Sequence, residues 1–116
     1  MVLIASKDEE SVRSLAASLE PLGWRLGVAR TDVEIFDRLA EEYPDFVVLD
    51  LETTDLKPAG LVSILHYIAP SLRVIALTGR STREDAAVVE KGVFYYTAKP
   101  VGRDLVELVT GGKGGI

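Results

Sequence analysis

Short apolar runs alternate with segments of helical periodicity along the whole sequence, and this alternation constrains the fold more than any other feature. The apolar runs have the length of buried strands and cover residues 2–5, 24–29, 46–49, 73–77 and 93–97. Between them, apolar residues recur at helical spacing. Strands and helices in strict alternation build a parallel sheet with helices on both faces, because each crossover connection is right-handed. The sequence therefore predicts an α/β fold, a doubly wound (βα)5 domain with a five-stranded parallel sheet.

Capping residues and glycines mark where the predicted helices begin and end. The start signals are Ser6 or Asp8 for the first helix and the capping-box patterns at residues 31–34 and 81–84, and the stop signals are Gly23 and Gly92. A glycine suits these stop positions because it adopts the left-handed backbone conformation without strain.

Apolar spacing also predicts which helix faces lie against the sheet. The side chains expected there are Val33, Phe36, Leu39 and Ala40 in the second helix, and Leu61, Ile64, Leu65 and Ile68 in the third. His66 is the only histidine and lies off this stripe, so we expect it on the surface.

Length limits the chain to one domain, since 116 residues suffice for a single core. A short last helix is expected over about residues 103–109. The glycines that follow it predict a flexible tail. We therefore expect a domain over residues 1–110 and a flexible tail over residues 111–116.

Charge and composition exclude several function classes. The net charge of −5 argues against direct binding of nucleic acid, which needs a basic surface. The absence of cysteine excludes disulfides and thiolate chemistry. The apolar runs are too short to span a membrane, and the N-terminus has no pattern of a secretory signal. We expect a cytoplasmic protein.

Polar side chains follow four of the five predicted strands. In open parallel sheets, ligands bind outside the carboxyl ends of the strands, where the strand order reverses. With the flavodoxin-like order 2-1-3-4-5, four strand ends lie side by side. The residues at these ends are Ser6, Lys7 and Asp8 after the first strand, Asp50 after the third, Thr78 after the fourth, and Lys99 and Pro100 after the fifth. One cleft would thus collect a carboxylate, a hydroxyl and one or two ammonium groups.

Three motifs at these strand ends carry a family resemblance. They are residues 47–50, 75–78 and 92–100, with the sequences VVLD, IALT and GVFYYTAKP. Each motif alone is weak, but the set in this order and at these spacings is specific. Over essentially its whole length, the chain resembles the receiver domains of bacterial two-component systems, the CheY-like response regulators.

The resemblance implies a role for each residue of the cleft. Asp50 matches the phospho-accepting aspartate, while Thr78 and Lys99 match the residues that contact the phosphoryl group. Tyr96 matches the aromatic residue that changes rotamer with the state of the site. Pro100 matches a proline whose preceding peptide bond is often cis. Such a domain signals rather than catalyses, takes its phosphoryl group from a histidine kinase, and often precedes an output domain beyond its C-terminus.

The chain departs from the family at the cation site. Family members hold Mg²⁺ with acidic residues after the first strand and with the acceptor aspartate, here Asp50 together with the backbone of Glu52. When the chain is aligned with the family pattern by counting back from Gly23 without gaps, Ser6 and Lys7 fall at the two positions that are acidic in the family. The loop after residue 50 is also about two residues longer than in the family before its glycine.

Two acids next to these positions leave the cation site open to two interpretations. Asp8 and Glu9 can rescue cation binding if the loop shifts by one residue. Alternatively, they favour the N-terminus of the first helix through its dipole.

Lys7 also leaves two hypotheses open. Its ammonium group can take the place of the cation and bridge toward Asp50, which would lower the pKa of Asp50. Alternatively, Lys7 points into solvent and the cleft is inactive.

Three functions follow from these alternatives. The first is a receiver domain of a phosphorelay, with Asp50 as phospho-acceptor. The second is a phosphorylation-independent interaction module, a pseudo-receiver, whose partner is a histidine kinase or another signalling protein. A remote third is a small flavodoxin-like cofactor-binding protein, but residues 8–10 are three adjacent acids where a phosphate loop would have to lie.

Overall fold

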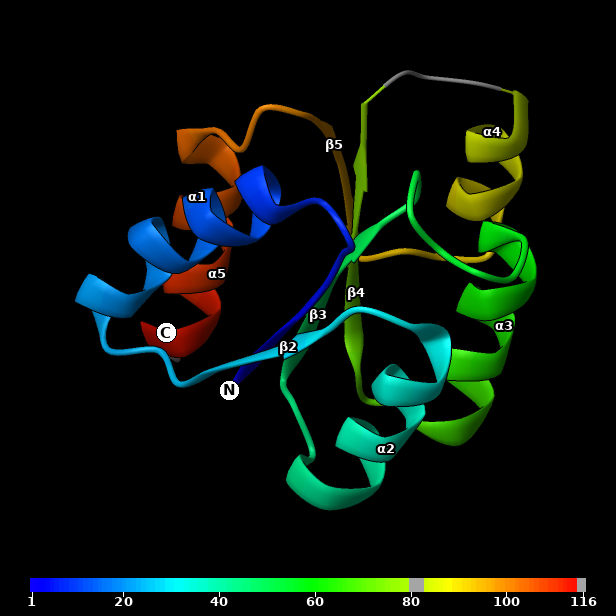
Figure 1. The fold of residues 1–116 in the computed structure, drawn as a ribbon, viewed down its shortest axis with the longest axis horizontal. Coiled ribbons are helices and arrows are strands. Elements are labelled where there is room, and N and C mark those ends of the chain that lie inside the picture. Colours follow the sequence, from blue (N-terminus) through cyan, green and yellow to red (C-terminus); the bar gives the residue numbers. More distant parts are fainter. Residues whose placement is uncertain (80–82, 115–116) are drawn as a thin grey trace.

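The computed structural model describes residues 1–79 and 83–114 and shows one five-stranded parallel sheet (Figure 1). The strands lie in the order β2-β1-β3-β4-β5, so the predicted fold class and strand order are confirmed. They are β1 (Val2–Ala5), β2 (Leu26–Ala29), β3 (Phe46–Asp50), β4 (Arg73–Thr78) and β5 (Tyr95–Ala98). β1 and β3 pair at the centre, where the order reverses. The sequence placed the starts of β2 and β5 two residues too early.

Helices cover both faces of this sheet. They are α1 (Glu9–Leu19), α2 (Asp32–Glu42), α3 (Pro58–Ile68), α4 (Arg83–Glu90) and α5 (Arg103–Gly114), with a short 3-10 helix, η1 (Glu20–Leu22), after α1. α1 and α5 lie on one face, and α2, α3 and α4 lie on the other (Figure 1). Alternate residues of the central strands point to these two layers. Leu3 and Val47 face the α2–α4 layer, while Ile4 and Val48 face the α1/α5 layer.

The helix ends follow the predicted signals where the structure describes them. The Asp8 side chain caps α1 by accepting from the Glu10 amide, and Gly23 adopts a φ of 88° after η1. Thr31 opens α2 with a complete capping box. Gly92 has a φ of 86° after α4. The second capping box, at residues 81–84, lies partly outside the described residues.

The predicted buried faces of α2 and α3 are partly wrong. Val33 is 67% exposed, and Ile35 is buried in its place. In α3, Ile64 and Ile68 are exposed while Val62 is buried. Both helices carry more apolar positions than one buried stripe can hold. Spacing alone therefore cannot decide which set faces the sheet.

The C-terminal helix is longer than expected. α5 runs to Gly114, so residues 111–114 are helical where the sequence predicted a flexible tail. Glycine lowers helix propensity without forbidding the helix, and no proline interrupts this segment. None of the helices among the described residues has the length and apolar character to cross a membrane.

Candidate functional site

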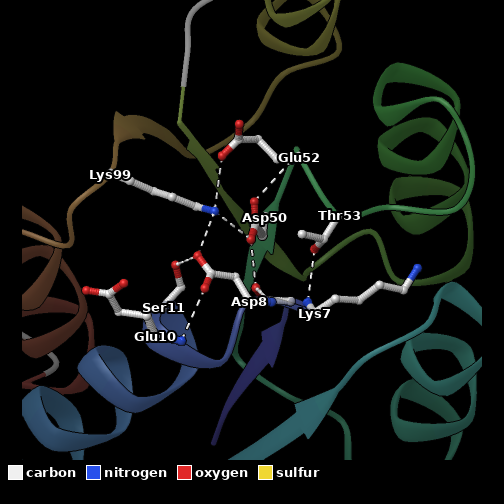
Figure 2. Close-up of polar contacts among 9 residues, drawn as sticks. Lys7, Asp8, Glu10, Ser11, Asp50, Glu52, Thr53 and Lys99 are labelled. Carbon is white, nitrogen blue, oxygen red and sulfur yellow. Dashed lines mark hydrogen bonds and ion pairs between the residues drawn. The ribbon is translucent and has the colours of Figure 1, made fainter.

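Asp50 ends β3 at the carboxyl edge of the sheet, and its side chain is only 1% exposed (Figure 2). The Ser6 hydroxyl donates to Asp50 Oδ2 at 2.7 Å, and the Lys99 ammonium contacts the same oxygen at 2.9 Å. The backbone amide of Glu52 donates to Asp50 Oδ1 at 3.1 Å. Both carboxylate oxygens therefore have partners within the chain, which a buried charge requires.

The Lys99 ammonium lies between three carboxylates. Besides Asp50, its Nζ contacts Asp8 Oδ2 and Glu52 Oε1, each at 3.2 Å (Figure 2). Partial burial lowers the pKa of Lys99, but its hydrogen bonds to these three acids outweigh burial and raise that pKa well above its usual value. The peptide bond between Lys99 and Pro100 is cis. Lys99 is thus a permanent cation in the cleft.

Asp8 belongs to the site and also to the helix that follows it. Its Oδ1 accepts from the Glu10 amide at 3.1 Å, and its Oδ2 accepts from the Ser11 hydroxyl at 2.7 Å as well as from Lys99. The hydrogen bonds from Ser11 and Lys99 lower the pKa of Asp8 below its usual value. Glu9 instead forms an ion pair with Arg30, away from the cluster.

Ser6 occupies the first of the two substituted positions and is buried. Its hydroxyl donates to Asp50 and accepts from the Asp8 amide at 2.9 Å. The hydroxyl thereby joins the end of β1 to the end of β3. An acid at this position would instead bring a further negative charge next to Asp50.

Lys7, at the second substituted position, turns away from Asp50. Its ammonium group forms an ion pair with Asp55, in the loop after β3. Figure 2 shows the Lys7 side chain extending away from Asp50. The hypothesis that Lys7 bridges to Asp50 is therefore wrong. Lys7 is exposed, as the alternative expected, and its ammonium group pairs with Asp55. An internal cation does contact Asp50, but it is Lys99.

The longer loop after β3 is fixed by contacts to the end of β1 and to the start of α2. The Lys7 amide donates to Thr53 Oγ1 at 3.0 Å. Asp55 Oδ2 accepts from the Asp32 amide at 2.9 Å, and Asp32 Oδ1 accepts from the Asp55 amide at 3.2 Å. Asp32 Oδ2 also accepts from the Leu56 amide at 2.8 Å. The loop is thereby held against the start of α2, and we call Lys7, Asp32 and Asp55 the loop clamp.

Thr78 and Tyr96 lie on the neighbouring strands. Thr78 ends β4, is buried, and accepts the Lys99 amide through its backbone oxygen at 2.6 Å. Tyr96 is half-buried in β5, and its hydroxyl donates to Asp85 Oδ2 of α4 at 2.7 Å. The neighbouring Tyr95 donates to Asp104 Oδ2 of α5 at 2.7 Å. The two tyrosines thus tie β5 to the helix on each side of the sheet.

The donor set in the cleft does not fit the divalent cation that the resemblance implies. The resemblance assigns two acids to the positions of Ser6 and Lys7, and the Lys99 ammonium lies among the carboxylates of Asp8, Asp50 and Glu52. Within residues 1–79 and 83–114, no group of three or more acidic or histidine side chains is arranged to hold a metal ion. The arrangement balances the buried charge of Asp50 with an ammonium group and a hydroxyl.

Sequence reasoning missed two members of the site. It considered only the backbone of Glu52, whereas the carboxylate of Glu52 also contacts Lys99. Gly79 leaves room for this carboxylate, because a Cβ at that position would overlap Glu52 Oε1. It also missed Asp55, since a polar loop carries no periodicity that would orient its side chains.

Comparisons with known proteins agree with this fold. Residues 2–110 match the response regulator receiver domain family. The chain is 28% identical to the transcriptional regulatory protein GlrR of Escherichia coli (strain K12) over 104 residues, which are 89% of this chain and 23% of that protein. It is 31% identical to the response regulator MprA of Mycobacterium sp. (strain KMS) over 100 residues, 85% of this chain and 44% of that protein. The chain therefore spans less than half the length of these curated relatives.

A solved structure gives the same architecture. The CheY-like response regulator receiver domain protein from Methanospirillum hungatei JF-1 superposes with a TM-score of 0.87 at 24% identity, covering 98% of this chain and 93% of that one. At this identity the likeness shows the fold alone. The match over residues 2–110, together with the strand order and the arrangement of the strand ends, shows that the chain belongs to the response regulator receiver domain family.

Proposed function

We propose that this receiver domain is a phosphorylation-independent interaction module whose Asp50 site is held in one state by its own cation. The observation that carries the proposal is the contact between the Lys99 ammonium and Asp50 Oδ2 at 2.9 Å, beside the Ser6 hydroxyl on the same oxygen. Lys99 and Ser6 thereby satisfy the buried carboxylate without a metal or a phosphoryl group.

Charge in the cleft supports this proposal. Transfer of a phosphoryl group to a carboxylate requires that the developing negative charge be neutralised. Here one ammonium group faces three carboxylates, those of Asp8, Asp50 and Glu52. A phosphoryl group would add negative charge to a cluster in which the acids already exceed the base.

The phosphorelay function remains the second candidate, with Asp50 as phospho-acceptor and Thr78 and Lys99 as the groups that contact the phosphoryl. One observation favours it. Asp8 lies close enough to share the Lys99 ammonium with Asp50, so a carboxylate is present on the β1 side of the cleft. If the domain acts in a phosphorelay, the Asp8 carboxylate would bind Mg²⁺ in place of the acids that are missing at Ser6 and Lys7. Tyr96 would then change rotamer with the state of the site.

Incubation with acetyl phosphate and Mg²⁺, followed by intact-mass measurement, separates the two candidates. We expect no gain of a phosphoryl group in the natural sequence. A gain that is absent from Asp50→Asn would overturn the proposal and establish the phosphorelay candidate. The double variant Ser6→Asp/Lys7→Asp restores acids at both substituted positions and serves as the comparison, since it should gain a phosphoryl group that depends on Asp50.

Partners follow from the family. Receiver domains interact with histidine kinases and often precede output domains, and two relatives of this chain are named as a transcriptional regulatory protein and a response regulator. We propose that the partner here is a histidine kinase or another signalling protein that binds one fixed conformation. An output module in the same polypeptide is part of this proposal.

A further inference from the structure

Two cationic side chains and one imidazole, each from a different element, line one hollow at the edge of the sheet opposite Asp50. His66 lies near the end of α3, Arg73 is the first residue of β4, and Lys91 follows α4. Together with Phe94, they line a hollow of about 310 Å³. In a parallel sheet, the start of β4 and the end of β3 lie at opposite edges, so this hollow is separate from the Asp50 site.

Aromatic contacts fix the cation at the base of the hollow. The Arg73 guanidinium carbon lies 4.2 Å from the centroid of the Phe46 ring and 5.7 Å from that of Phe94. Stacking of this kind orients a guanidinium group without using its N–H donors. His66 Cε1 lies about 4.0 Å from the position that a Cβ on Gly92 would take, so the imidazole ring lies beside the turn after α4.

None of these three side chains forms an ion pair with a carboxylate among residues 1–79 and 83–114. Lys91 is exposed, whereas His66 and Arg73 are half-buried. The positive charges of Arg73 and Lys91 thus lie in one hollow without a carboxylate partner, in a protein whose net charge is −5. The hollow is a local basic site on an acidic molecule.

An apolar groove adjoins the hollow. It has a volume of about 650 Å³, lies between the ends of α2 and α3, and shares Pro70, Leu72 and Arg73 with the hollow. Its further lining includes Phe36, Leu39, Tyr43 and Ile68, of which Tyr43 and Ile68 are largely exposed. Its acidic lining residue, Asp45, is paired with the N-terminal ammonium at 2.6 Å. We call the hollow and the groove together the basal surface.

We propose that the basal surface docks an acidic segment of a partner protein that also carries apolar side chains. Charge complementarity selects this occupant, because carboxylates on the segment would meet two cations that have no carboxylate partner, Arg73 and Lys91. Apolar side chains of the segment would fill the neighbouring groove, and exposed Phe94 adds an aromatic contact in the hollow. Nucleic acid is disfavoured because two cations are few and the rest of the surface repels phosphate.

A peptide titration tests this surface independently of the Asp50 site. The probe is a short acetylated and amidated peptide that alternates glutamate with leucine, added to the ¹⁵N-labelled chain and followed by amide chemical shifts. We expect saturable shifts centred on His66, Arg73 and residues 91–94, and an affinity that falls with added salt. A matching peptide with glutamine in place of glutamate should bind at least about tenfold more weakly.

Two charge-reversed variants make the test specific. Lys91→Glu should weaken peptide binding at least about tenfold, since it places a negative charge in the hollow. Arg13→Glu makes the same charge change at an exposed position of α1, on the other face of the sheet, and should leave binding within about twofold. Both positions are exposed, and unchanged amide spectra elsewhere show that each variant is folded.

The remaining outcomes overturn the proposal. The absence of saturable shifts would do so, as would shifts centred elsewhere or equal weakening by Lys91→Glu and Arg13→Glu. Equal binding of the glutamine peptide would show an apolar groove with no preference for acids. Self-association that Lys91→Glu abolishes would assign the surface to a second copy of the chain. If His66 and Lys91 only stabilise the C-terminal ends of α3 and α4, Lys91→Glu will lower stability while peptide binding is absent.

Discussion

At the scale of single residues, the site rests on the balance between one ammonium group and three carboxylates. Asp50 is buried, and the two carboxylates that share Lys99 with it are more exposed. Removal of the cation would leave the buried charge of Asp50 with only the Ser6 hydroxyl and the Glu52 amide as partners. The contribution of Lys99 to folding therefore depends on whether Asp50 is charged.

This dependence predicts a non-additive effect on stability. Lys99→Met should lower the free energy of unfolding by about 3 kcal/mol, because it leaves a buried carboxylate uncompensated. In an Asp50→Asn background the same substitution should cost roughly 1 kcal/mol or less, since no buried charge then remains at Asp50. Urea denaturation of the four proteins measures this difference. Equal costs in both backgrounds would show that Lys99 does not neutralise Asp50.

A second prediction concerns the titration of Asp8. Its hydrogen bonds to Ser11 and Lys99 lower its pKa in the folded chain below the ordinary value of 3.8. The stability that comes from charged Asp8 is therefore fully present above that ordinary value. It is lost as the pH falls through the lowered pKa of the folded state. Carboxyl-carbon chemical shifts should show Asp8 titrating below 3.8, and Lys99→Met should move this titration upward. An unchanged titration in Lys99→Met would contradict the contact.

At the scale of elements, the loop after β3 is held by the loop clamp rather than by a bound ion. The buried carboxylate of Asp32 accepts two amides of this loop, from Asp55 and Leu56, and Lys7 pairs with Asp55. The Lys7–Asp55 pair is half-exposed and worth little by itself. The buried hydrogen bonds of Asp32 therefore carry most of the constraint.

Removal of the Asp32 side chain should release the loop. Asp32→Ala leaves the Asp55 and Leu56 amides without their acceptors, and should lower stability by about 1–3 kcal/mol and speed hydrogen exchange at both amides. Asp37→Ala is the matched control, because Asp37 lies exposed on the same helix, and its cost should stay within about 0.5 kcal/mol. Exchange at Asp55 and Leu56 that is the same in both variants would show that Asp32 does not fix the loop.

The elements could be predicted from the sequence because their signals are local. Apolar runs placed each strand to within about two residues, and their alternation with helices predicted a parallel sheet. The flavodoxin-like strand order then brought Asp50 and Lys99 to one edge, where they are in contact. Helix faces were harder to predict, since an excess of apolar residues left Val33 exposed in α2.

Side-chain directions in loops could not be predicted. Lys7 was placed correctly at the end of β1, but its partner Asp55 lies in a loop whose path depends on Asp32. These three residues are far apart in the sequence and meet only in the folded chain. The contact of Asp8 with Lys99 was missed for the same reason, although the capping role of Asp8 follows from its position before α1.

At the scale of the whole molecule, the two edges of the sheet differ in charge. The carboxyl edge holds Asp8, Asp50 and Glu52 around one lysine, while the opposite edge carries the cations of the basal surface. The two sites lie at opposite ends of the strands, because Asp50 ends β3 and Arg73 begins β4. A partner bound at the basal surface would therefore contact no residue of the Asp50 cluster.

We propose that Lys99 takes the place of a divalent cation at Asp50. Titration of the ¹⁵N-labelled domain with Mg²⁺, followed by the amide signals of Asp8, Asp50 and Glu52, measures whether a metal binds there. If Lys99 replaces the metal, these signals show no saturable shift at millimolar Mg²⁺, and a saturable shift appears once Ser6→Asp/Lys7→Asp restores the acids. A saturable shift in the natural sequence that Asp50→Asn removes would show that a metal binds at Asp50, and Lys99 would then not replace it.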